Sequence, residues 1–351
     1  MTERHVSVEN LVKTYPGAAK PSVDDVSFSL PRGEMLALLG PSGCGKTTIL
    51  RMIAGLVEPS SGAIRLNGRE VSGIPVHKRN MGMVFQAYAL FPHMTVAENI
   101  AFGLEMRGIA KADRAAKVAR ALDLVKLTGL GDRRTTQLSG GQQQRCAIAR
   151  SLVIEPELLL LDEPLSNLDA KLRDEMRDEI REIQGRTGVT AIFVTHDQDE
   201  ALSMADRLAV MSAGRLEQIG TPRQIFDRPE TEFVASFIGA GNFLNGRVTG
   251  AGEAAVDGFG TLRFVGDAAV GQDVRLMVRP HRLVMGGAAN SFTGTVEHIV
   301  YRGQILTMTV RSGQTRLQAD LHTHAGALPE KGQTVTLGVA PEDVTFIGRA
   351  A

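Results

Sequence analysis

The feature that most constrains this chain is GPSGCGKTT at residues 40–48, which follows the apolar segment EMLALL at 34–39 and precedes a helical pattern over 46–56. It matches G-x-x-x-x-G-K-[ST], and a buried strand before it with a helix after it is the context that supports such a match. Glycines allow backbone N–H groups to surround phosphates, while a lysine and a hydroxyl group contact the phosphates and Mg²⁺. The pattern predicts a nucleotide site in an α/β fold; a loop with a purely structural role is the alternative.

Nearly every residue of this loop is a candidate phosphate ligand. A helix N-terminus contributes only about 0.3–1 kcal/mol toward an anion at an exposed site, so the lysine, the metal and many amides must add to it. Lys46 is assigned to the β and γ phosphates and Thr47 to Mg²⁺. The expected ATP-binding residues of the loop are Gly40, Ser42, Gly43, Cys44, Gly45, Lys46, Thr47 and Thr48.

Strand-like and helix-like segments alternate over about the first 235 residues, which predicts an α/β layer architecture. LLLLD at 158–162 and AIFVT at 191–195 are continuously apolar, as parallel strands covered on both faces tend to be. Between about 97 and 150 the pattern becomes helical, with apolar residues at helical spacing in DRAAKVARALDLVKL. We therefore expect a nucleotide-binding domain at 1–238 that includes a helical subdomain at about 87–150.

The C-terminal third of the chain has a different texture. From about residue 243, short segments such as QDVRLMV alternate apolar and polar residues, and glycine is frequent. GQDVRLMVRP at 271–280 and GQTVTLGVAP at 332–341 share Gly, Gln, Val, Leu, Val and Pro at matching places. This repeat predicts a small all-β domain at 239–351 that arose by duplication. Two unrelated strands that each end at a proline are the alternative.

Two carboxylates follow the apolar segment LLLL in LLLLDEP. Side chains alternate between the two faces of a strand, so Asp162 and Glu163 can serve one site only where the strand ends. We assign Asp162 to Mg²⁺ and Glu163 to the attacking water as general base. An acidic turn before Pro164 is the alternative.

Three further side chains are candidates for the same site. Gln86 in VFQAYALFPH can orient water and contact the metal, and His196 in THD can donate a hydrogen bond to the γ phosphate. Tyr15 in KTYPG can stack on adenine. A histidine taken alone more often has a structural role, and only the neighbouring motifs favour a catalytic one here; ordinary surface packing is the alternative for the tyrosine.

A second glycine-rich helix start occurs in LSGGQQQRCAIARSL at 138–152. The backbone amides of Ser139, Gly140 and Gly141 lie where a helix start can bind an anion. A plain helix cap by Ser139 is the alternative, since serine is a good N-cap residue. We expect at least one of the glutamines at 142–144 to lie on a solvated helical face.

Taken in order, Tyr15, GPSGCGKTT, Gln86, LSGGQ, LLLLDEP, SNLD and His196 resemble the full motif series of ATP-binding-cassette (ABC) ATPases. In that family LSGGQ is the signature motif, and it completes the ATP site of the opposing subunit in a head-to-tail dimer. Asn167 and Cys146 depart slightly from the family's common pattern. The resemblance implies a homodimer with Asp169 at its interface, and it implies trans contacts to the nucleotide from Ser139, Gly140, Gly141 and Gln142.

The β domain resembles the C-terminal oligonucleotide-binding-like (TOBE) extension of the ATPase subunits of bacterial importers. This implies an ATPase beneath transmembrane permease subunits at the cytoplasmic face of the inner membrane, served indirectly by a periplasmic solute-binding protein. A short permease helix is expected to dock on residues 86–94; packing of Tyr88 and Phe91 inside the helical segment is the alternative. A polyamine such as spermidine or putrescine is the expected solute, with ferric iron, phosphonates and sugars as alternatives.

Composition argues against other classes of protein. The 39 Lys and Arg residues balance 39 Asp and Glu residues, so no net field favours nucleic acid. The two cysteines, Cys44 and Cys146, fit a reducing cytoplasm. The longest apolar runs fall far short of the roughly 18 residues that cross a bilayer, so no membrane span is expected. A soluble ABC ATPase without a transport role and a module that binds ATP without hydrolysing it are less favoured, the latter because of Glu163.

Replacing Lys46 with alanine tests the phosphate assignment. We expect Lys46→Ala to bind ATP too weakly for occupancy at cellular concentrations, because the helix start alone contributes so little. A nucleotide titration of both proteins measures this effect. Unchanged affinity in the variant would count against the assignment.

Overall fold

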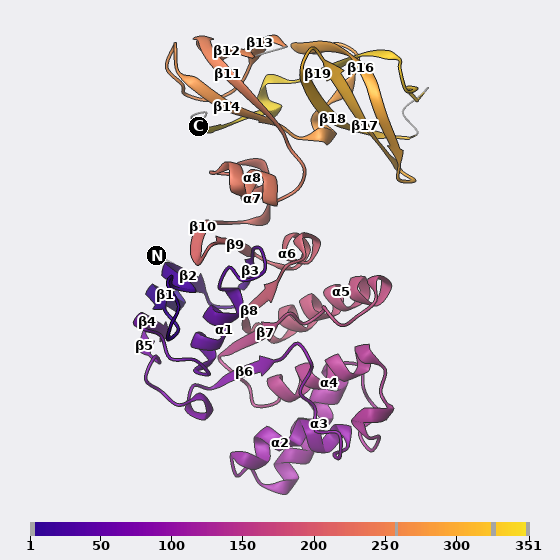
Figure 1. The fold of residues 1–351 in the computed structure, drawn as a ribbon. Helices are drawn as coiled ribbons and strands as arrows, with labels where there is room; N and C mark the ends of the chain where they lie inside the picture. The colour runs from indigo at the N-terminus through magenta and orange to yellow at the C-terminus, as the bar shows by residue number, and fades with distance from the viewer. Residues whose placement is uncertain (1–3, 257–258, 324–327, 349–351) are drawn as a thin grey trace. The chain divides into compact units, whose positions relative to one another are not determined.

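The computed structural model describes residues 4–256, 259–323 and 328–348 (Figure 1). Contacts within the chain divide it into two compact units, Met1–Pro222 and Arg223–Ala351. Each unit has a hydrophobic core of its own. The first is a mixed α/β unit and the second consists mainly of β-strands, as the sequence predicted.

The first unit contains one antiparallel sheet, β2-β1-β4-β5, and one mostly parallel sheet, β10-β9-β3-β8-β7-β6. In the second of these sheets β10 runs antiparallel to its neighbour. The strands of the antiparallel sheet are β1 (Arg4–Lys13), β2 (Val23–Pro31), β4 (Ser61–Leu66) and β5 (Arg69–Glu70). Those of the parallel sheet are β3 (Met35–Leu39), β6 (Met81–Val84), β7 (Leu158–Asp162), β8 (Thr190–Thr195), β9 (Arg207–Ser212) and β10 (Arg215–Gly220).

Strands β3, β7 and β8 are buried along their whole length. Their continuously apolar sequences suit strands that are covered on both faces, and the strands predicted at 34–39, 158–162 and 191–195 are confirmed. Because these strands are parallel, their carboxyl ends meet at one edge of the sheet. The loop at 40–48, Glu163 and His196 follow those ends.

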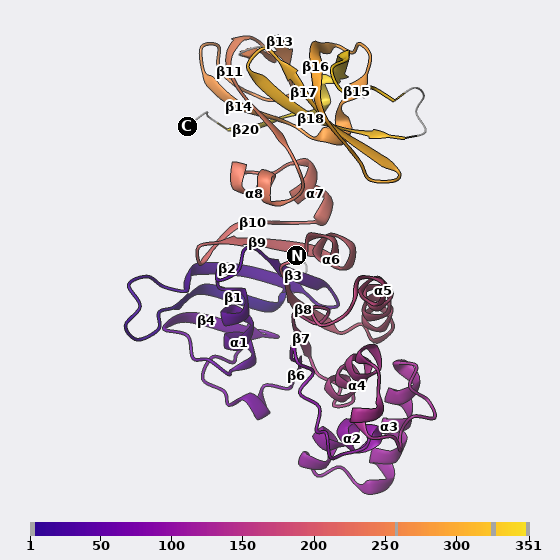
Figure 2. The same cartoon turned by 45° about the vertical axis from the view of Figure 1, so that its right-hand side comes forward.

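Helix α1 (Lys46–Ala54) lies between the two sheets (Figures 1 and 2). Its Ile49, Leu50 and Ile53 are fully buried in a core that includes residues of both sheets, such as Val8 and Ile192. Helices α5 (Ala170–Thr187) and α6 (Gln198–Met204) lie on the other side of the parallel sheet (Figure 1). Covering both faces of this sheet places the phosphate loop on a rigid support.

Three helices form a separate cluster beside the parallel sheet (Figure 2). They are α2 (Val96–Met106), α3 (Lys111–Leu124) and α4 (Gly140–Leu152), and short 3-10 turns occur at η1 (Val76–Lys78) and η2 (Thr135–Gln137). A capping box of Thr95 and Glu98 begins α2. The helix predicted around DRAAKVARALDLVKL is confirmed as α3. Within the described residues, no helix is long and apolar enough to span a bilayer.

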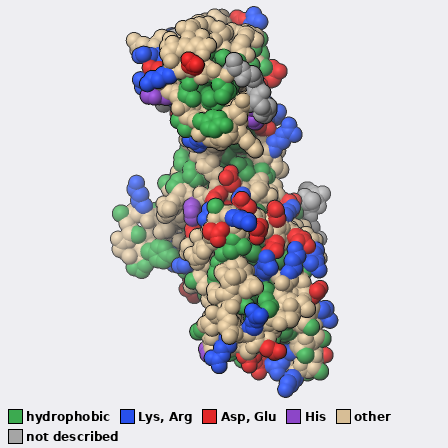
Figure 3. Space-filling view, turned by 90° about the vertical axis from the view of Figure 1, so that its right-hand side faces the viewer, with side chains coloured by type: hydrophobic (Ala, Val, Ile, Leu, Met, Phe, Trp, Pro, Cys, Tyr) green, Lys and Arg blue, Asp and Glu red, His purple; other side chains and the backbone are tan. Residues whose placement is uncertain are grey.

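The outer surface of α5 carries charges of both signs. Figure 3 shows acidic and basic side chains intermixed over this region. Ion pairs such as Arg145 with Glu179 and Arg181 with Asp206 join this helix to its surroundings. Intermixed charges cancel at a distance, so this face produces no strong field of one sign.

The second unit contains two antiparallel sheets, β13-β12-β11-β14-β20 and β15-β19-β16-β17-β18. Each half of the repeat runs through a strand, a 3-10 turn that begins at a proline, and a last strand that pairs with the other half. The strand–turn–strand unit predicted from the repeat is present in both halves, and the exchange of the last strands unites both halves in one core. The elements are β11 (Asn242–Gly250), β12 (Glu253–Val256), β13 (Gly260–Arg263), β14 (Asp273–Val278), η3 (Pro280–Arg282), β15 (Val284–Met285), β16 (Asn290–Tyr301), β17 (Ile305–Ser312), β18 (Thr315–His322), β19 (Thr334–Val339), η4 (Pro341–Asp343) and β20 (Val344–Gly348).

Helices α7 (Pro222–Asp227) and α8 (Glu232–Phe237) are tied to the strands of this unit by Arg279. The Arg279 guanidinium donates to the carbonyls of Phe226, Ala235 and Ala240 at 2.9–3.0 Å and lies 4.5 Å from the Phe226 ring centroid. Burial lowers the pKa of Arg279 to about 10. These buried hydrogen bonds explain why contacts group both helices with the second unit, which begins at Arg223 rather than at residue 239.

Candidate nucleotide site

Two glycines allow the loop at 40–48 to pack against neighbouring backbone. Gly45 has a φ of +101°, and a Cβ atom there would lie 2.4 Å from the carbonyl oxygen of Ser22. A Cβ atom on Gly40 would lie 2.3 Å from the carbonyl oxygen of Met211. Gly45 is also the N-cap of α1 and has no side chain that could accept hydrogen bonds from the first amides of the helix. Those amides are therefore available to an anion.

Lys46 places its charge inside this loop. Its Nζ donates to the carbonyl oxygens of Gly40 at 2.7 Å and Pro41 at 3.0 Å, and lies 3.7 Å from the Sγ of the buried Cys44. Pro41, Ser42 and Gly43 are exposed, whereas Thr47 and Thr48 are half-buried. The loop thus combines a buried ammonium group with the free amides of a helix start, which suits a triphosphate.

Asp162 and Thr47 form a second part of the site at the end of β7. The Thr47 hydroxyl donates to Asp162 Oδ1 at 3.4 Å, and an Arg51 nitrogen lies 3.8 Å from Oδ2. Burial raises the pKa of Asp162, an effect that Arg51 partly offsets. A buried carboxylate of this kind is stabilised by a nearby cation, and oxygen ligands are those that Mg²⁺ prefers. The pair therefore fits a magnesium ion bound to phosphates.

Glu163 turns out of the strand because its backbone is left-handed, with a φ of +47°. Its N–H donates to the Val194 carbonyl at 3.1 Å, which fixes it against β8. Gln86 Nε2 donates to Glu163 Oε2 at 3.1 Å, and His196 Nδ1 lies 3.6 Å from Oε1. The change of backbone conformation explains how Asp162 and Glu163, adjacent in sequence, can both face the carboxyl edge of the sheet.

A small cavity of about 40 Å³ adjoins Glu163 and His196. One water requires about 10–15 Å³ of such volume, so the cavity has room for a water beside the carboxylate. Glu200 also lines it, accepts a hydrogen bond from Thr195 at 2.6 Å, and has its pKa raised by burial. This arrangement can hold a water next to a base.

The candidate residues fall into two groups. Hydrogen bonds join Thr47 to Asp162 and Gln86 to Glu163, and an ion-pair contact joins His196 to Glu163. In the part of the chain that the structure describes, no such contact links these residues to the other candidates. Those are Tyr15, Ser139, Gly140, Gly141, Gln142 and Asp169. Tyr15 is 40% exposed, and Lys13 Nζ lies 5.2 Å from its ring centroid.

Within one chain the signature segment acts as a helix cap. Ser139 and Gln142 form a capping box that begins α4, and Asp169 caps α5 by accepting from the Leu172 N–H at 3.0 Å. Ser139 and Gly140 are nevertheless exposed. Of the glutamines expected on a solvated face, Gln142 and Gln143 are half-buried and only Gln144 is excluded from solvent. Gln142 caps the helix, Gln143 donates to the carbonyls of Thr135 and Leu138, and Gln144 is fully buried.

Two residues that were not assigned to the site from the sequence hold the segment after Gln86. Asn167 Nδ2 donates to the Gln86 carbonyl at 2.8 Å. Arg150 donates to the carbonyls of Tyr88 at 2.9 Å and Ala89 at 2.7 Å, two consecutive residues with left-handed backbone. Asn167 was noted from the sequence as a departure from the family pattern. No sequence motif indicates that Arg150 contacts residues 88 and 89.

Tyr88 and Phe91 lie in the segment expected to meet a membrane partner. Tyr88 is 7% exposed, and burial raises its pKa. Phe91 is half-buried, with its ring centroid 4.7 Å from that of Phe102. Both rings therefore pack inside the unit, which is the alternative noted from the sequence.

Comparisons with known proteins agree with this geometry. Residues 23–166 match the ABC transporter family and residues 276–347 match the TOBE domain. The chain is 28% identical to a dimeric post-hydrolysis structure of the ATP-binding cassette MJ0796 bound to ADP and Pi, with a TM-score of 0.55 over 62% of this chain and 99% of that one.

Two curated relatives extend over nearly the whole chain. The spermidine/putrescine import ATP-binding protein PotA of Thermobifida fusca is 44% identical and covers 96% of this chain and 92% of its own length. The Fe(3+) ions import ATP-binding protein FbpC of Rhizobium etli is also 44% identical and covers 97% of both chains. The chain therefore belongs to the ABC transporter family, as an ATP-hydrolysing subunit of the import type that uses Mg²⁺ and carries a C-terminal TOBE domain.

Proposed function

We propose that this chain energises solute import as a homodimer at the cytoplasmic face of a bacterial inner membrane, beneath permease subunits that receive solute from a periplasmic binding protein. The observation that carries the proposal is the contact of Glu163 with Gln86 and His196 at the edge of the sheet that bears the phosphate loop. The near full-length relatives named as import ATP-binding proteins support the transport role.

In the proposed reaction, Glu163 accepts a proton from the attacking water at a carboxylate oxygen. Gln86 and His196 hold that carboxylate from its two oxygens, and Lys46 and the loop amides bind the phosphates. General-base catalysis of this kind contributes about 10²–10⁴-fold. When bound by Thr47, Asp162 and Gln86, Mg²⁺ would neutralise charge on the phosphates. Tyr15 would stack on the adenine.

We propose a homodimer because the loop at 40–48 would cover a bound triphosphate from one side only. Ser139, Gly140, Gly141 and Gln142 have no contact with the loop of their own chain among the described residues, yet Ser139 and Gly140 are exposed at a helix start. A second copy can use that start to cover the outer side of the triphosphate. Asp169 is exposed at the start of α5 and would lie at the same interface. The dimeric neighbour with ADP and Pi supports this arrangement.

A groove beside the segment at 86–94 suits the permease. It has a volume of about 650 Å³ and is bounded by His93, Met94 and the facing sides of α2 and α3. Glu98, Glu105, Lys111 and Arg114 line it with Ala97, Ala101 and Val118, so it offers both apolar and charged contacts. We assign it to a short cytoplasmic helix of the permease, the segment expected to dock there.

Arg150 is proposed to connect this groove to catalysis. Its guanidinium holds the carbonyls of residues 88 and 89, which lie between Gln86 and the groove residues His93 and Met94. If a bound partner moved His93 and Met94, the movement would therefore have to pass the carbonyls that Arg150 holds before it reached Gln86. Arg150 is a positioning residue, since it acts on the reaction through Gln86.

For the solute we propose a polyamine, as for the Thermobifida fusca relative. The ferric-ion relative is equally identical to this chain, so Fe³⁺ is the principal alternative, with phosphonates and sugars after it. Isolation of the solute-binding protein that copurifies with the permease complex, followed by titration with spermidine and Fe³⁺, separates these candidates. Retention of Fe³⁺ but not spermidine would reject the polyamine assignment.

Glu163→Gln tests the hydrolytic part of the proposal. The amide keeps the shape of the side chain but cannot accept a proton at neutral pH, so phosphate release should fall about 10²–10⁴-fold while ATP still binds. We expect the variant to elute as a stable dimer on gel filtration with ATP and Mg²⁺. Glu58→Gln, a change at an exposed position, serves as the matched control. Elution as monomer only would reject the proposed closure, and wild-type turnover would reject the base.

Arg150→Met tests the positioning role. Because Gln86 should lose its fixed position, kcat should fall by about tenfold or more while the Kd for ATP stays within roughly twofold. Arg150→Lys should restore part of the activity, since lysine carries the charge without the planar fork that reaches both carbonyls. Arg145→Met on the same helix, which loses a pair with Glu179 instead, is the control. A fall in ATP affinity that equals the fall in kcat/KM would show a structural role only.

A further inference from the structure

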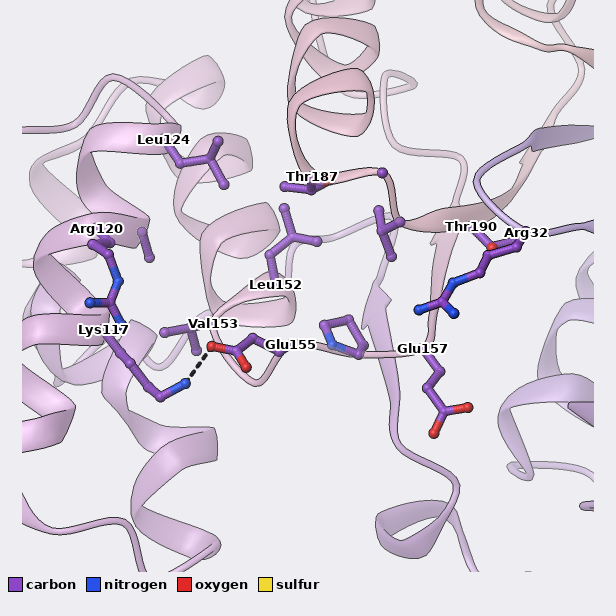
Figure 4. Close-up of a pocket in the computed structure, with 14 residues that line it drawn as sticks. Arg32, Lys117, Arg120, Leu124, Leu152, Val153, Glu155, Glu157, Thr187 and Thr190 are labelled. Carbon is purple, nitrogen blue, oxygen red and sulfur yellow. Dashed lines mark hydrogen bonds and ion pairs between the residues drawn. The ribbon is translucent and has the colours of Figure 1, made fainter. Parts of the chain in front are cut away.

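A cavity of about 400 Å³ lies on the side of the first unit away from the phosphate loop. It is bordered by α3, the end of α4, the turn before β7 and the start of β8 (Figure 4). Strands β7 and β8 begin here, whereas the nucleotide residues follow their carboxyl ends. The cavity is thus a different site from the one already described, and its volume is within the range of small-molecule sites, about 300–1,000 Å³.

The apolar lining of the cavity is substantial. Ala121, Leu152, Val153 and Val189 are each at most 9% exposed and contribute to it. Leu124 and Pro156 complete the apolar part of the lining. An apolar group of a ligand would be removed from water on this surface, at about 25 cal/mol per Å² of area buried.

The charged groups around the cavity differ in whether they have partners. Lys117 forms an ion pair with Glu155, and Glu157 accepts hydrogen bonds from Asn67 at 2.5 Å and Asn80 at 3.5 Å. By contrast, the guanidinium groups of Arg32 and Arg120 have no hydrogen bond or ion pair within residues 4–256, 259–323 and 328–348. Figure 4 shows these two arginines on opposite sides of the cavity, with Lys117 turned toward Glu155.

We propose that this cavity binds a small organic anion that has an apolar body and one carboxylate, phosphonate or sulfonate group. Lys117 offsets the charge of Glu155, and the two arginines outnumber the one remaining carboxylate, Glu157, so the sum of the lining charges is positive. A guanidinium matches the two oxygens of a carboxylate with two parallel hydrogen bonds. A bound ligand would touch both α3 and the sheet edge at β8, two parts of the unit that are otherwise separated here by the cavity.

Three compounds with one apolar body and different charges test the proposal. They are 1-naphthoate, 1-naphthamide and 1-naphthylmethylammonium, each titrated calorimetrically into the full chain. Hydrogen bonds to a charged group are worth about 1.5–3 kcal/mol, which corresponds to roughly tenfold or more in Kd. Naphthoate should therefore bind at least about tenfold more tightly than the amide, and the ammonium compound should bind most weakly. Equal affinity for all three would overturn the proposal.

Variants locate the binding. Arg32→Gln or Arg120→Gln should weaken naphthoate binding several-fold, according to which guanidinium pairs with the carboxylate, while Arg32→Lys and Arg120→Lys should keep the preference for the anion. Arg69→Gln, another exposed arginine that lies outside the cavity, is the matched control. Lys46→Ala should leave naphthoate affinity unchanged, which separates this site from the phosphate loop. Loss of binding in Lys46→Ala, or unchanged binding in both glutamine variants, would reject the assignment.

Discussion

A triphosphate at the start of α1 would be covered by this chain from one side only, and that constraint governs the rest of the proposed mechanism. The loop offers one buried ammonium group and the first amides of a helix, and a helix start by itself contributes about 0.3–1 kcal/mol. The charge on the outer side of the phosphates must be met by other groups. In our proposal a second copy supplies them from the start of α4.

Backbone conformation determines which side chains reach this site. The left-handed turn at Glu163 directs the carboxylate toward Gln86 and His196, and two further left-handed residues, Tyr88 and Ala89, lie two and three residues after Gln86. Such conformations cost of order 1–3 kcal/mol each for non-glycine residues and persist where the surroundings fix them. Here the fixing groups are identifiable: the Val194 carbonyl for Glu163, Asn167 for Gln86, and Arg150 for the turn.

The sequence predicted the parts of the structure that depend on local patterns. Fully apolar segments identified β3, β7 and β8, and the glycine pattern placed the loop between β3 and α1, because burial on both faces and a phosphate turn each leave a local signature. The antiparallel sheet was not anticipated, since β1 pairs not only with β2, the next strand, but also with β4, which follows only after β3 and α1. Arg150 was missed for a similar reason: its partners at 88 and 89 lie about sixty residues away. The exchange of last strands in the second unit also depends on long-range pairing, which the repeat alone does not specify.

The most direct test of the shared site uses mixed dimers and ATP that carries a photoreactive group on its γ phosphate. Both copies carry Glu163→Gln, and one copy is tagged and also carries Lys46→Ala, so the nucleotide is held by the loop of the untagged copy. The account predicts labelling of residues 138–142 in the tagged copy. Label confined to the untagged copy would contradict it.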